Sequence, residues 1–357
     1  MAEEVMKTTD ERAAAALREK SANKDIDYSD VVLNVSGLKT QFFTSKGVVP
    51  AVDGVDIQIH RGESVGIVGE SGCGKSMTAM SIMQLLVSPG KVVAGKIELE
   101  GDNLLNKTNN EMADIRGNKI SMIFQEPMTS LNPVYIIGKQ VVEAVRQHRK
   151  DISKEEAKKM TIEMFRKVGI PEPEKRFYTY PHQLSGGLRQ RVMIAMAMIC
   201  DPTLMIADEP TTALDVTIEA QILFLMKQLQ KERGTAIMMI THNLGVVAES
   251  CDFVYVMYAG KIMEQANIFE LFRNPTHPYT FGLLNSIPKV TETKEHLYTI
   301  RGLVPNLLNL PKGCRFCTRC EKAMKVCTMY EPDMYEVAPG HLVRCFLANK
   351  EVMNSGK

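Results

Sequence analysis

One glycine-rich segment restricts the fold of this chain more than any other feature of its sequence. Residues 69–76 read Gly-Glu-Ser-Gly-Cys-Gly-Lys-Ser, which has the form G-x-x-x-x-G-K-S. An apolar, strand-like run over residues 64–68 precedes this segment, and a helix-compatible run over residues 77–86 follows it. Glycines in such a loop let consecutive backbone N–H groups point into one concavity, and the helix adds its positive N-terminal end. The strand–loop–helix order therefore predicts a nucleotide site, and disfavours a turn without function.

The residue types in this segment suit a triphosphate. Lys75 can reach the β- and γ-phosphates, and the Ser76 hydroxyl can bind Mg²⁺. Cys73 is interpreted as a neutral replacement of a small residue. The residues that we expect around the phosphates are Gly69, Ser71, Gly72, Cys73, Gly74, Lys75, Ser76 and Met77.

A second glycine-bearing segment reads Leu184-Ser185-Gly186-Gly187 and stands before a helical run over residues 188–200. Ser-Gly-Gly at a helix start offers free N–H groups and a hydroxyl, which makes it a second anion site. One triphosphate does not need two such cradles from one polypeptide. We therefore expect Ser185, Gly186 and Gly187 to reach a nucleotide held by the P-loop of a partner, with a plain helix cap as the alternative.

Two carboxylates follow an apolar run. Residues 204–207 fit a strand that is buried on both faces, and Asp208-Glu209-Pro210 comes directly after them. Ligands of open α/β sheets gather at the carboxyl ends of the strands. Both side chains are therefore expected to face the P-loop, unless they form only an acidic turn closed by the proline.

The segment Leu184–Gln190 resembles the signature motif of ATP-binding cassette (ABC) ATPases, in which two cassettes enclose two ATP molecules head to tail. This resemblance implies that Asp208 belongs to the Mg²⁺ shell through water. It also implies that Glu209 polarises the water that attacks ATP.

The same resemblance assigns residues elsewhere in the chain. Gln125 matches the glutamine that contacts Mg²⁺ and water and links the core to the helical subdomain, and His242 matches the histidine that hydrogen-bonds the γ-phosphate. Asp215 matches the loop that crosses the dimer interface, and it can equally cap a helix. Phe42 stands where the family stacks an aromatic ring on adenine, with Phe43 or a plain core role as alternatives.

Together these features predict an α/β P-loop cassette with a mainly parallel core sheet and an antiparallel β-subdomain, drawn from residues of about 31–60 and 92–101. The predicted divisions are an N-terminal extension over 1–30, mobile or loosely helical, an ATPase domain over 31–283 with a helical subdomain at about 126–183, and a small Cys-rich C-terminal extension over 284–357.

Charge and hydropathy exclude other classes. Lys and Arg number 43 against 42 Asp and Glu, so no basic field suggests nucleic-acid binding. No stretch of 18 or more apolar residues is present, and residues 1–30 lack the layout of a secretory signal. We therefore expect a cytosolic protein that meets a membrane through partners. A single P-loop and a single signature segment mean that another chain must supply the second cassette.

Cysteines gather in the C-terminal tail. Five of the eight lie in the last 44 residues, at positions 314, 317, 320, 327 and 345. A cytosolic protein keeps its thiols reduced, so the cluster favours a metal over disulfides. Thiolates with these short spacers suit a tetrahedral Zn²⁺ ion and an iron–sulfur cubane equally well. A chance grouping of core thiols is the alternative.

Longer segments sharpen the resemblance. Gln125–Pro133, Asn274–Thr280, Gly302–Pro305 and Pro311–Cys314 resemble the ATPases of oligopeptide/dipeptide importers. Some members hold a [4Fe–4S] cluster, with zinc as the alternative metal here. The residues matching that frame are Cys314, Cys320, Cys327 and Cys345, with Cys317 as an extra thiol and possible substitute.

The resemblance implies an ATP-hydrolysing subunit that powers import of peptides or related small solutes from the cytoplasmic face of the inner membrane. Its expected partners are a homologous but non-identical ATPase subunit, two transmembrane permease subunits and an extracytoplasmic solute-binding protein. The alternative of another class is a soluble iron–sulfur ABC ATPase without a transport role, which the single cassette and Gln125–Pro133 argue against. A metal-sensing regulatory subunit is a third interpretation, compatible with the first.

Overall fold

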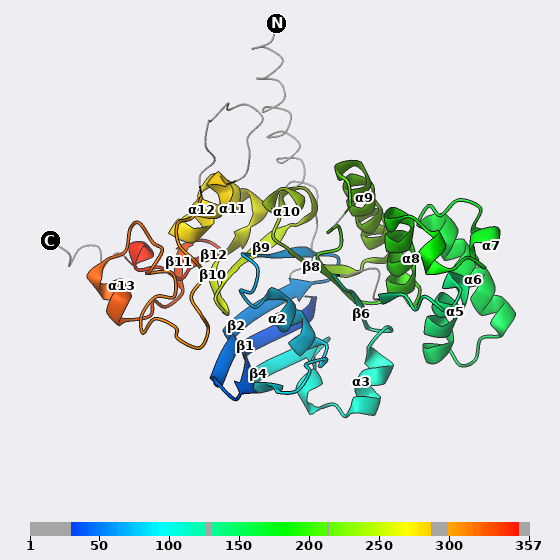
Figure 1. Ribbon diagram of the computed structural model, residues 1–357, viewed down its shortest axis with the longest axis horizontal. Coiled ribbons are helices and arrows are strands. Elements are labelled where there is room, and N and C mark those ends of the chain that lie inside the picture. The colour runs from blue at the N-terminus through cyan, green and yellow to red at the C-terminus, as the bar shows by residue number, and fades with distance from the viewer. Residues whose placement is uncertain (1–29, 126–129, 213, 287–298, 350–357) are drawn as a thin grey trace, which may run out of the picture.

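A mainly parallel β-sheet forms the centre of the molecule (Figure 1). The computed structural model describes residues 30–125, 130–212, 214–286 and 299–349. Almost all of the predicted N-terminal extension lies outside these ranges. Within them, the larger sheet has eight strands in the order β11-β12-β10-β9-β3-β8-β7-β6. The strands are β3 (Ser64–Val68), β6 (Ile120–Ile123), β7 (Leu204–Asp208), β8 (Ala236–Thr241), β9 (Phe253–Tyr258), β10 (Lys261–Asn267), β11 (Tyr335–Ala338) and β12 (His341–Val343).

Strands β6, β7, β8, β3 and β9 run parallel to one another, and every residue of β3, β7 and β8 is buried. Successive side chains of such strands face opposite sides of the sheet. Ile67 and Ile240 belong to one hydrophobic cluster, whereas their neighbours Val68 and Met239 belong to another. This accounts for the continuous apolar runs in the sequence, because both faces of the sheet are covered.

The smaller sheet is antiparallel, in the order β2-β1-β4-β5, and packs on one of those faces. Helix α2 joins the two sheets: the Thr40 and Ser81 hydroxyl oxygens are 2.7 Å apart. The predicted β-subdomain and the predicted fold class are thus confirmed. The strands are β1 (Val31–Thr44), β2 (Gly47–His60), β4 (Gly90–Leu99) and β5 (Asp102–Asn103), and α2 spans Lys75–Ile82.

Helices cover the opposite face, and a group of them forms one end of the molecule (Figure 1). The members of this group are α5 (Ile137–His148), α6 (Lys154–Lys167), α7 (Pro173–Arg176) and α8 (Gly186–Met198). Ser153 and Glu156 begin α6 with a reciprocal capping box, which satisfies N–H groups that the helix leaves free. The remaining helices are α3 (Asn109–Ile115), α9 (Val216–Arg233), α10 (Leu244–Ser250), α11 (Ile268–Arg273), α12 (Pro278–Asn285) and α13 (Lys325–Met329), with short 3₁₀ turns at Leu104–Asn106, Pro181–Gln183 and Phe346–Ala348.

The C-terminal residues extend the core sheet, although the sequence suggested a module beside it. Strand β12 pairs with β10, and β11 pairs with β12. The fully buried Glu264 of β10 accepts backbone hydrogen bonds from Thr276 and His277, and one of its oxygens lies 2.8 Å from Nε2 of His341. This buried pair fastens β12 to the sheet.

The Glu264–His341 pair predicts a pH-dependent stability. Burial alone lowers the pKa of His341, but its contacts with Glu264 and Glu270 raise that pKa above its ordinary value. The contribution to stability is therefore complete below the unfolded pKa of about 6.5 and is lost as pH rises through the folded pKa. We expect His341→Asn to lower the free energy of unfolding by roughly 3 kcal/mol near pH 6 and by less at higher pH, measured by urea denaturation. The exposed His182→Asn is the control, and a deficit that grew with pH would contradict the pairing.

Candidate active site

The P-loop lies between β3 and α2, where the backbone requires glycine. Gly69 has φ 155°, and a Cβ there would stand 2.1 Å from the carbonyl oxygen of Met257. Gly74 has φ 109°, and a Cβ there would stand 2.4 Å from the carbonyl oxygen of Ala51. Gly74 is the N-cap of α2 and has no side chain to occupy the first N–H groups of the helix. Those N–H groups are available to an anion.

Lys75 and Ser76 follow at the helix start. The Lys75 ammonium donates to the carbonyl oxygens of Gly69, at 2.8 Å, and Glu70, at 3.0 Å, so it folds back over its own loop. The Ser76 hydroxyl donates to the Asp208 carboxylate at 3.1 Å. Two of the three residues expected at Mg²⁺, Ser76 and Asp208, thus lie in contact, whereas the third, Gln125, contacts Glu209. The buried Cys73 thiol lies 3.9 Å from the Lys75 ammonium.

Three side chains converge on the Glu209 carboxylate, at the end of β7. Gln125 Nε2 and the Thr212 hydroxyl each donate to Oε2 at 2.9 Å, and His242 Nδ1 lies 3.0 Å from Oε1. Gln125 follows β6 and His242 follows β8, so the three neighbouring parallel strands bring these residues together at their carboxyl ends. Sequence reasoning missed Thr212, which the turn after Glu209 returns to the same carboxylate.

The two acidic neighbours differ in electrostatic environment. Burial raises the pKa of the Asp208 carboxyl, and the Ser76 hydroxyl opposes that rise. Burial also acts to raise the pKa of Glu209, but hydrogen bonds from His242, Thr212 and Gln125 lower it below its ordinary value. Glu209 is therefore a carboxylate at neutral pH, already surrounded by donors.

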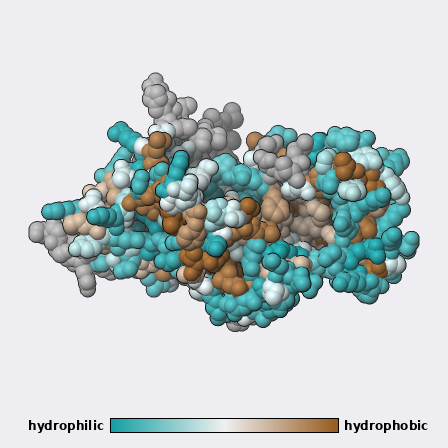
Figure 2. All heavy atoms as spheres, turned by 60° about the horizontal axis from the view of Figure 1, so that its bottom comes forward, coloured by the Kyte–Doolittle hydropathy of each residue, from teal (hydrophilic) through white to brown (hydrophobic). Residues whose placement is uncertain are grey.

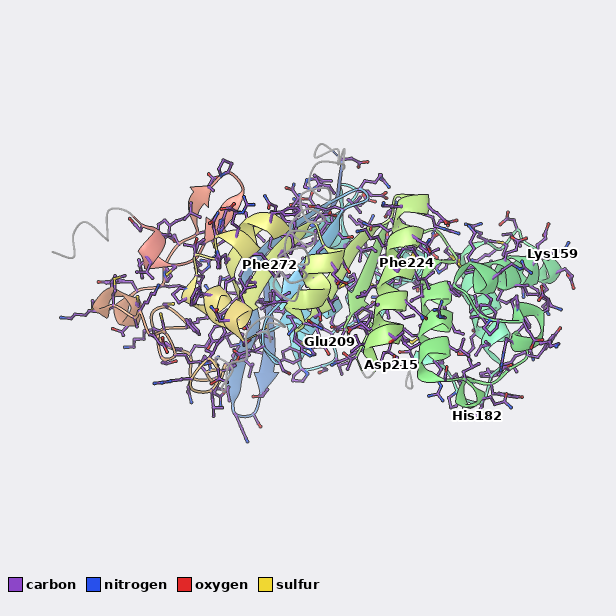
Figure 3. All side chains as sticks on the ribbon, turned by 90° about the horizontal axis from the view of Figure 1, so that it is seen from above. Lys159, His182, Glu209, Asp215, Phe224 and Phe272 are labelled. Atoms are coloured by element: carbon purple, nitrogen blue, oxygen red, sulfur yellow. The ribbon has the colours of Figure 1, made fainter. Side chains whose placement is uncertain are left out.

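The signature segment does not meet the P-loop of its own chain in the contacts that the structure describes. Ser185 caps α8 by accepting from the Leu188 N–H at 3.4 Å, and Asp215 caps α9 by accepting from the Ile218 N–H at 2.9 Å. Figure 3 shows His182, three residues before Ser185, well away from Glu209. Gly186 and Gly187 begin the same helix. Both caps are present, and the predicted roles at a partner's nucleotide stay predictions.

The two candidates for adenine stacking lie on β1. Phe42 is half-buried, and its ring lies against Gly90 of β4, where an added Cβ would stand 2.7 Å from the ring. Phe43 is 47% exposed. The predicted contact of Met77 with a nucleotide stays a prediction too; Met77 packs partly buried at the start of α2.

The five tail cysteines line one small cavity. Burial, with neighbouring thiols adding to it, raises the pKa of Cys314 to about 12 and that of Cys345 to about 11. In the described part of the chain, no three His, Cys, Asp or Glu side chains are grouped so that they could hold one metal ion. The side chains as they stand do not support the predicted metal site, although Cys317, Cys320 and Cys327 share the cavity with the other two thiols.

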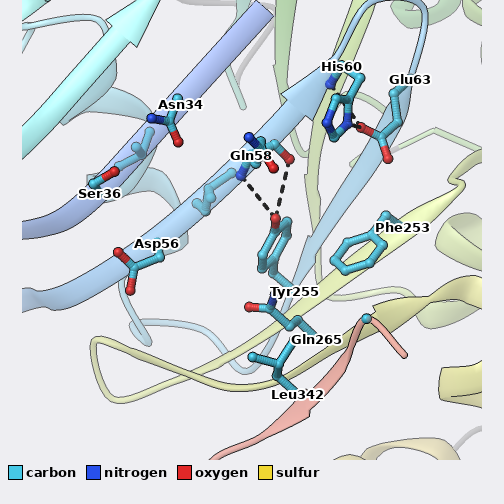
Figure 4. A pocket seen from close by; sticks show the side chains of 13 residues that line it. Asn34, Ser36, Asp56, Gln58, His60, Glu63, Phe253, Tyr255, Gln265 and Leu342 are labelled. Carbon is cyan, nitrogen blue, oxygen red and sulfur yellow. Dashed lines mark hydrogen bonds and ion pairs between the residues drawn. The ribbon is translucent and has the colours of Figure 1, made fainter. Parts of the chain in front are cut away.

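A second cavity, lined by residues other than the predicted site residues, lies between the two sheets (Figure 4). The Tyr255 hydroxyl there lies 3.0 Å from the backbone nitrogen of Gln58, and His60 Nδ1 lies 2.8 Å from the Glu63 carboxylate. None of the predicted site residues lines this cavity. On the face shown in Figure 2, hydrophilic residues predominate at the helical end with some apolar residues among them, whereas apolar residues gather toward the middle.

Comparison with known proteins shows which family this chain belongs to. The family described as ABC transporter matches residues 52–212, and the family described as oligopeptide/dipeptide transporter, C-terminal region, matches residues 263–327. The oligopeptide transport ATP-binding protein AppD of Bacillus subtilis is 52% identical over 321 residues, which cover 90% of this chain and 98% of AppD. This chain belongs to the ATP-binding proteins of the oligopeptide ABC transporter family.

A second relative agrees. The oligopeptide transport ATP-binding protein OppD of Escherichia coli is 49% identical over 325 residues, covering 91% of this chain and 96% of OppD. As an ABC ATP-binding protein the chain is an ATPase, with ATP and Mg²⁺ as the fitting nucleotide and ion. These relatives do not support the alternative of an iron–sulfur ABC ATPase without a transport role.

Solved structures confirm the ABC fold. A chain of the cassette MJ0796, from its dimeric structure in a post-hydrolysis state bound to ADP and phosphate, superposes with a TM-score of 0.60 at 27% identity, covering 66% of this chain and 98% of that one. CbiO1 of Clostridium perfringens, part of an ABC transporter complex, gives 0.58 at 28% identity and covers 69% of this chain and 92% of that one. Across the described ranges, every helix is too short or too polar to cross a bilayer.

Proposed function

We propose that this ABC ATPase powers the import of oligopeptides or related small solutes, with ATP held at residues 69–76 and hydrolysed at Glu209. The observation that carries the proposal is the convergence of Gln125 and His242 on Glu209, next to Asp208 and the P-loop. The names of the relatives and the match over residues 263–327 support peptides as the cargo.

The chain's own residues account for binding. Backbone N–H groups of the loop and of the first turn of α2 receive the phosphates, and Lys75 turns from the carbonyl oxygens of Gly69 and Glu70 to the β- and γ-phosphates. Ser76 and Asp208 present adjacent oxygen ligands that fit Mg²⁺, with Gln125 nearby through Glu209. Bound Mg²⁺ neutralises charge on the phosphate oxygens. An aromatic ring on β1, Phe42 by resemblance, supports the adenine.

Glu209 supplies the base. It is ionised and stands next to Asp208, which contacts Ser76 of the P-loop, so it can polarise a water for attack on phosphorus. Gln125 and His242 orient the carboxylate, and His242 also contacts the γ-phosphate in this scheme. Hydrolysis then depends on the position of three side chains and not on any covalent intermediate.

The site is completed by a second cassette. The starts of α8 and α9 would cover the nucleotide bound by a homologous, non-identical ATPase subunit. The residues at these helix starts are Ser185, Gly186, Gly187 and Asp215. The dimer of MJ0796 supports this arrangement. We place the ATPase domain at residues 31–283, with its helical subdomain at about 126–183 against two transmembrane permease subunits, and the C-terminal extension at 284–357. The complex sits at the cytoplasmic face of the inner membrane, and a solute-binding protein delivers the cargo.

Uptake into membrane vesicles tests the cargo. Vesicles that contain the permease subunits and both ATPases should accumulate a labelled oligopeptide when ATP is enclosed with the ATPases and a loaded binding protein is outside. Lys75→Ala should abolish uptake because it removes the ammonium group that binds the β- and γ-phosphates. Uptake of nickel and not of peptides would change the cargo and leave the ATPase assignment intact.

We also propose that the tail cavity holds a [4Fe–4S] cluster, with zinc as the alternative. One zinc ion draws its four ligands to about 2.3 Å from a single centre, whereas a cubane spreads its thiolates over several irons. What supports the proposal is the spacing of the tail cysteines and the cavity that all five of them line. Cys314, Cys320, Cys327 and Cys345 are the proposed ligands, with Cys317 able to substitute.

Metal analysis of protein purified without air tests this second proposal. We expect iron and sulfide in equal amounts with broad visible absorbance, lost in Cys327→Ser and kept in Cys317→Ser. Cys200→Ser, away from the tail, is the control. One equivalent of zinc without iron would replace the cluster by the alternative.

A further inference from the structure

Residues of the C-terminal region contact the P-loop at Glu70. The Glu70 backbone N–H donates to the Tyr279 hydroxyl at 2.9 Å. Its carboxylate takes two hydrogen bonds from the Arg319 guanidinium, Nη1 to Oε2 at 2.6 Å and Nη2 to Oε1 at 3.0 Å. Tyr279 and Arg319 both lie in residues 263–327, the part matched by the C-terminal family. The second residue of the phosphate loop is thus held at two points by residues that the C-terminal family matches.

The Arg319 guanidinium is held in place independently of Glu70. Its side chain is 4% exposed. Nε donates to the carbonyl oxygen of Arg301 at 3.0 Å, and Nη2 also lies 3.3 Å from that of Ile300. The rings of Tyr258 and Phe316 lie 5.8 and 6.0 Å from the guanidinium carbon. A planar fork held this way recognises a carboxylate with geometric specificity that a lysine does not match.

We propose that Arg319, together with Tyr279, is a positioning residue for ATP binding, because it fixes Glu70 and with it the backbone of the P-loop. Without nucleotide, Lys75 holds the loop by donating to the carbonyl oxygens of Gly69 and Glu70. Those bonds are given up when Lys75 turns to the phosphates. The bonds from Arg319 and Tyr279 then remain, and keep the loop's N–H groups aimed at the nucleotide.

Arg319 also stands between Cys317 and Cys320 in the sequence. The wall of the thiol cavity and the anchor of the P-loop therefore belong to one short segment. Phe316, in the same segment, lines the cavity and packs 5.3 Å from the Tyr279 ring. Any change in the backbone of this segment reaches Glu70 through both anchors. The inference rests on the proposed ATP site and not on a metal in the cavity.

Nucleotide affinity of the full chain tests the proposal, with a fluorescent ATP analogue as the probe. We expect Arg319→Gln and Glu70→Gln each to weaken ATP binding roughly tenfold or more. The double variant should bind ATP no more weakly than either single variant, because all three lose the same Arg319–Glu70 interaction. The ATP affinity of Arg319→Lys should lie between those of the wild type and of Arg319→Gln. In the assembled ATPase, KM for ATP should rise by a similar factor while kcat at saturating ATP changes by less than about threefold.

Arg344→Gln is the matched control. Arg344 is a partly buried arginine that follows residues 263–327, and in its described contacts it donates to the carbonyl oxygens of Ile262 and Pro332 and not to the P-loop. It should lower stability without changing ATP affinity. The partly exposed Glu70→Gln keeps the test valid if Arg319→Gln does not fold. The proposal would be overturned by an unchanged ATP affinity in Glu70→Gln or by additive losses of affinity in the double variant. If the wild-type chain bound no nucleotide, the proposed ATP site itself would be wrong.

Discussion

Glu209→Gln is expected to lower the rate of ATP hydrolysis by roughly 10² to 10⁴, the range for loss of a general base, while ATP still binds. The amide keeps the size of the side chain but cannot take a proton from water. It also removes a negative charge beside the triphosphate, so affinity for ATP should stay or rise. With the signature segment of each partner closed over ATP that is not consumed, the dimer should accumulate. Phosphate release and size-exclusion chromatography with Mg·ATP measure both effects.

Glu232→Gln is the control for that experiment. Glu232 lies at the end of α9 with its side chain 55% exposed, and it pairs with Lys167 in a surface contact at 3.4 Å. Its replacement should leave turnover within about twofold, because exposed ion pairs contribute little. Full turnover of Glu209→Gln in the assembled complex would remove Glu209 from the mechanism.

The meeting of these side chains was predictable because they stand at places where the fold leaves little choice. The apolar runs before residues 69, 125, 208 and 242 mark buried parallel strands, and side chains that follow such strands meet at one edge of the sheet. The structure accordingly brings Gln125, Glu209 and His242 together.

Other features left too weak a signal. Strand β12 is three residues long, so no periodicity reveals that the C-terminal segment joins the core sheet. The Arg319–Glu70 contact joins residues 249 positions apart, and neither residue type is unusual in its local sequence. Thr212 depends on a tight turn after Glu209, which has φ 46°. Contacts set by tertiary packing alone were therefore missed.

The second large effect is expected for Ser185→Arg. A bulky cation at the start of α8 should block the approach of this helix to the nucleotide of the partner cassette. Turnover of the assembled ATPase should fall at least about a hundredfold, as for loss of an essential positioning group. The isolated chain should still bind ATP with affinity within about twofold of wild type, because its own P-loop is untouched.

Ser153→Arg separates this effect from the loss of a helix cap. Ser153 caps α6 as Ser185 caps α8, so both replacements remove one hydrogen bond and cost about 1 kcal/mol of stability. Only Ser185→Arg should stop turnover, since α6 begins in the helical region away from the proposed interface with the nucleotide. A strictly monomeric preparation of Ser185→Arg that hydrolysed ATP at the full rate would show that one chain encloses its substrate unaided.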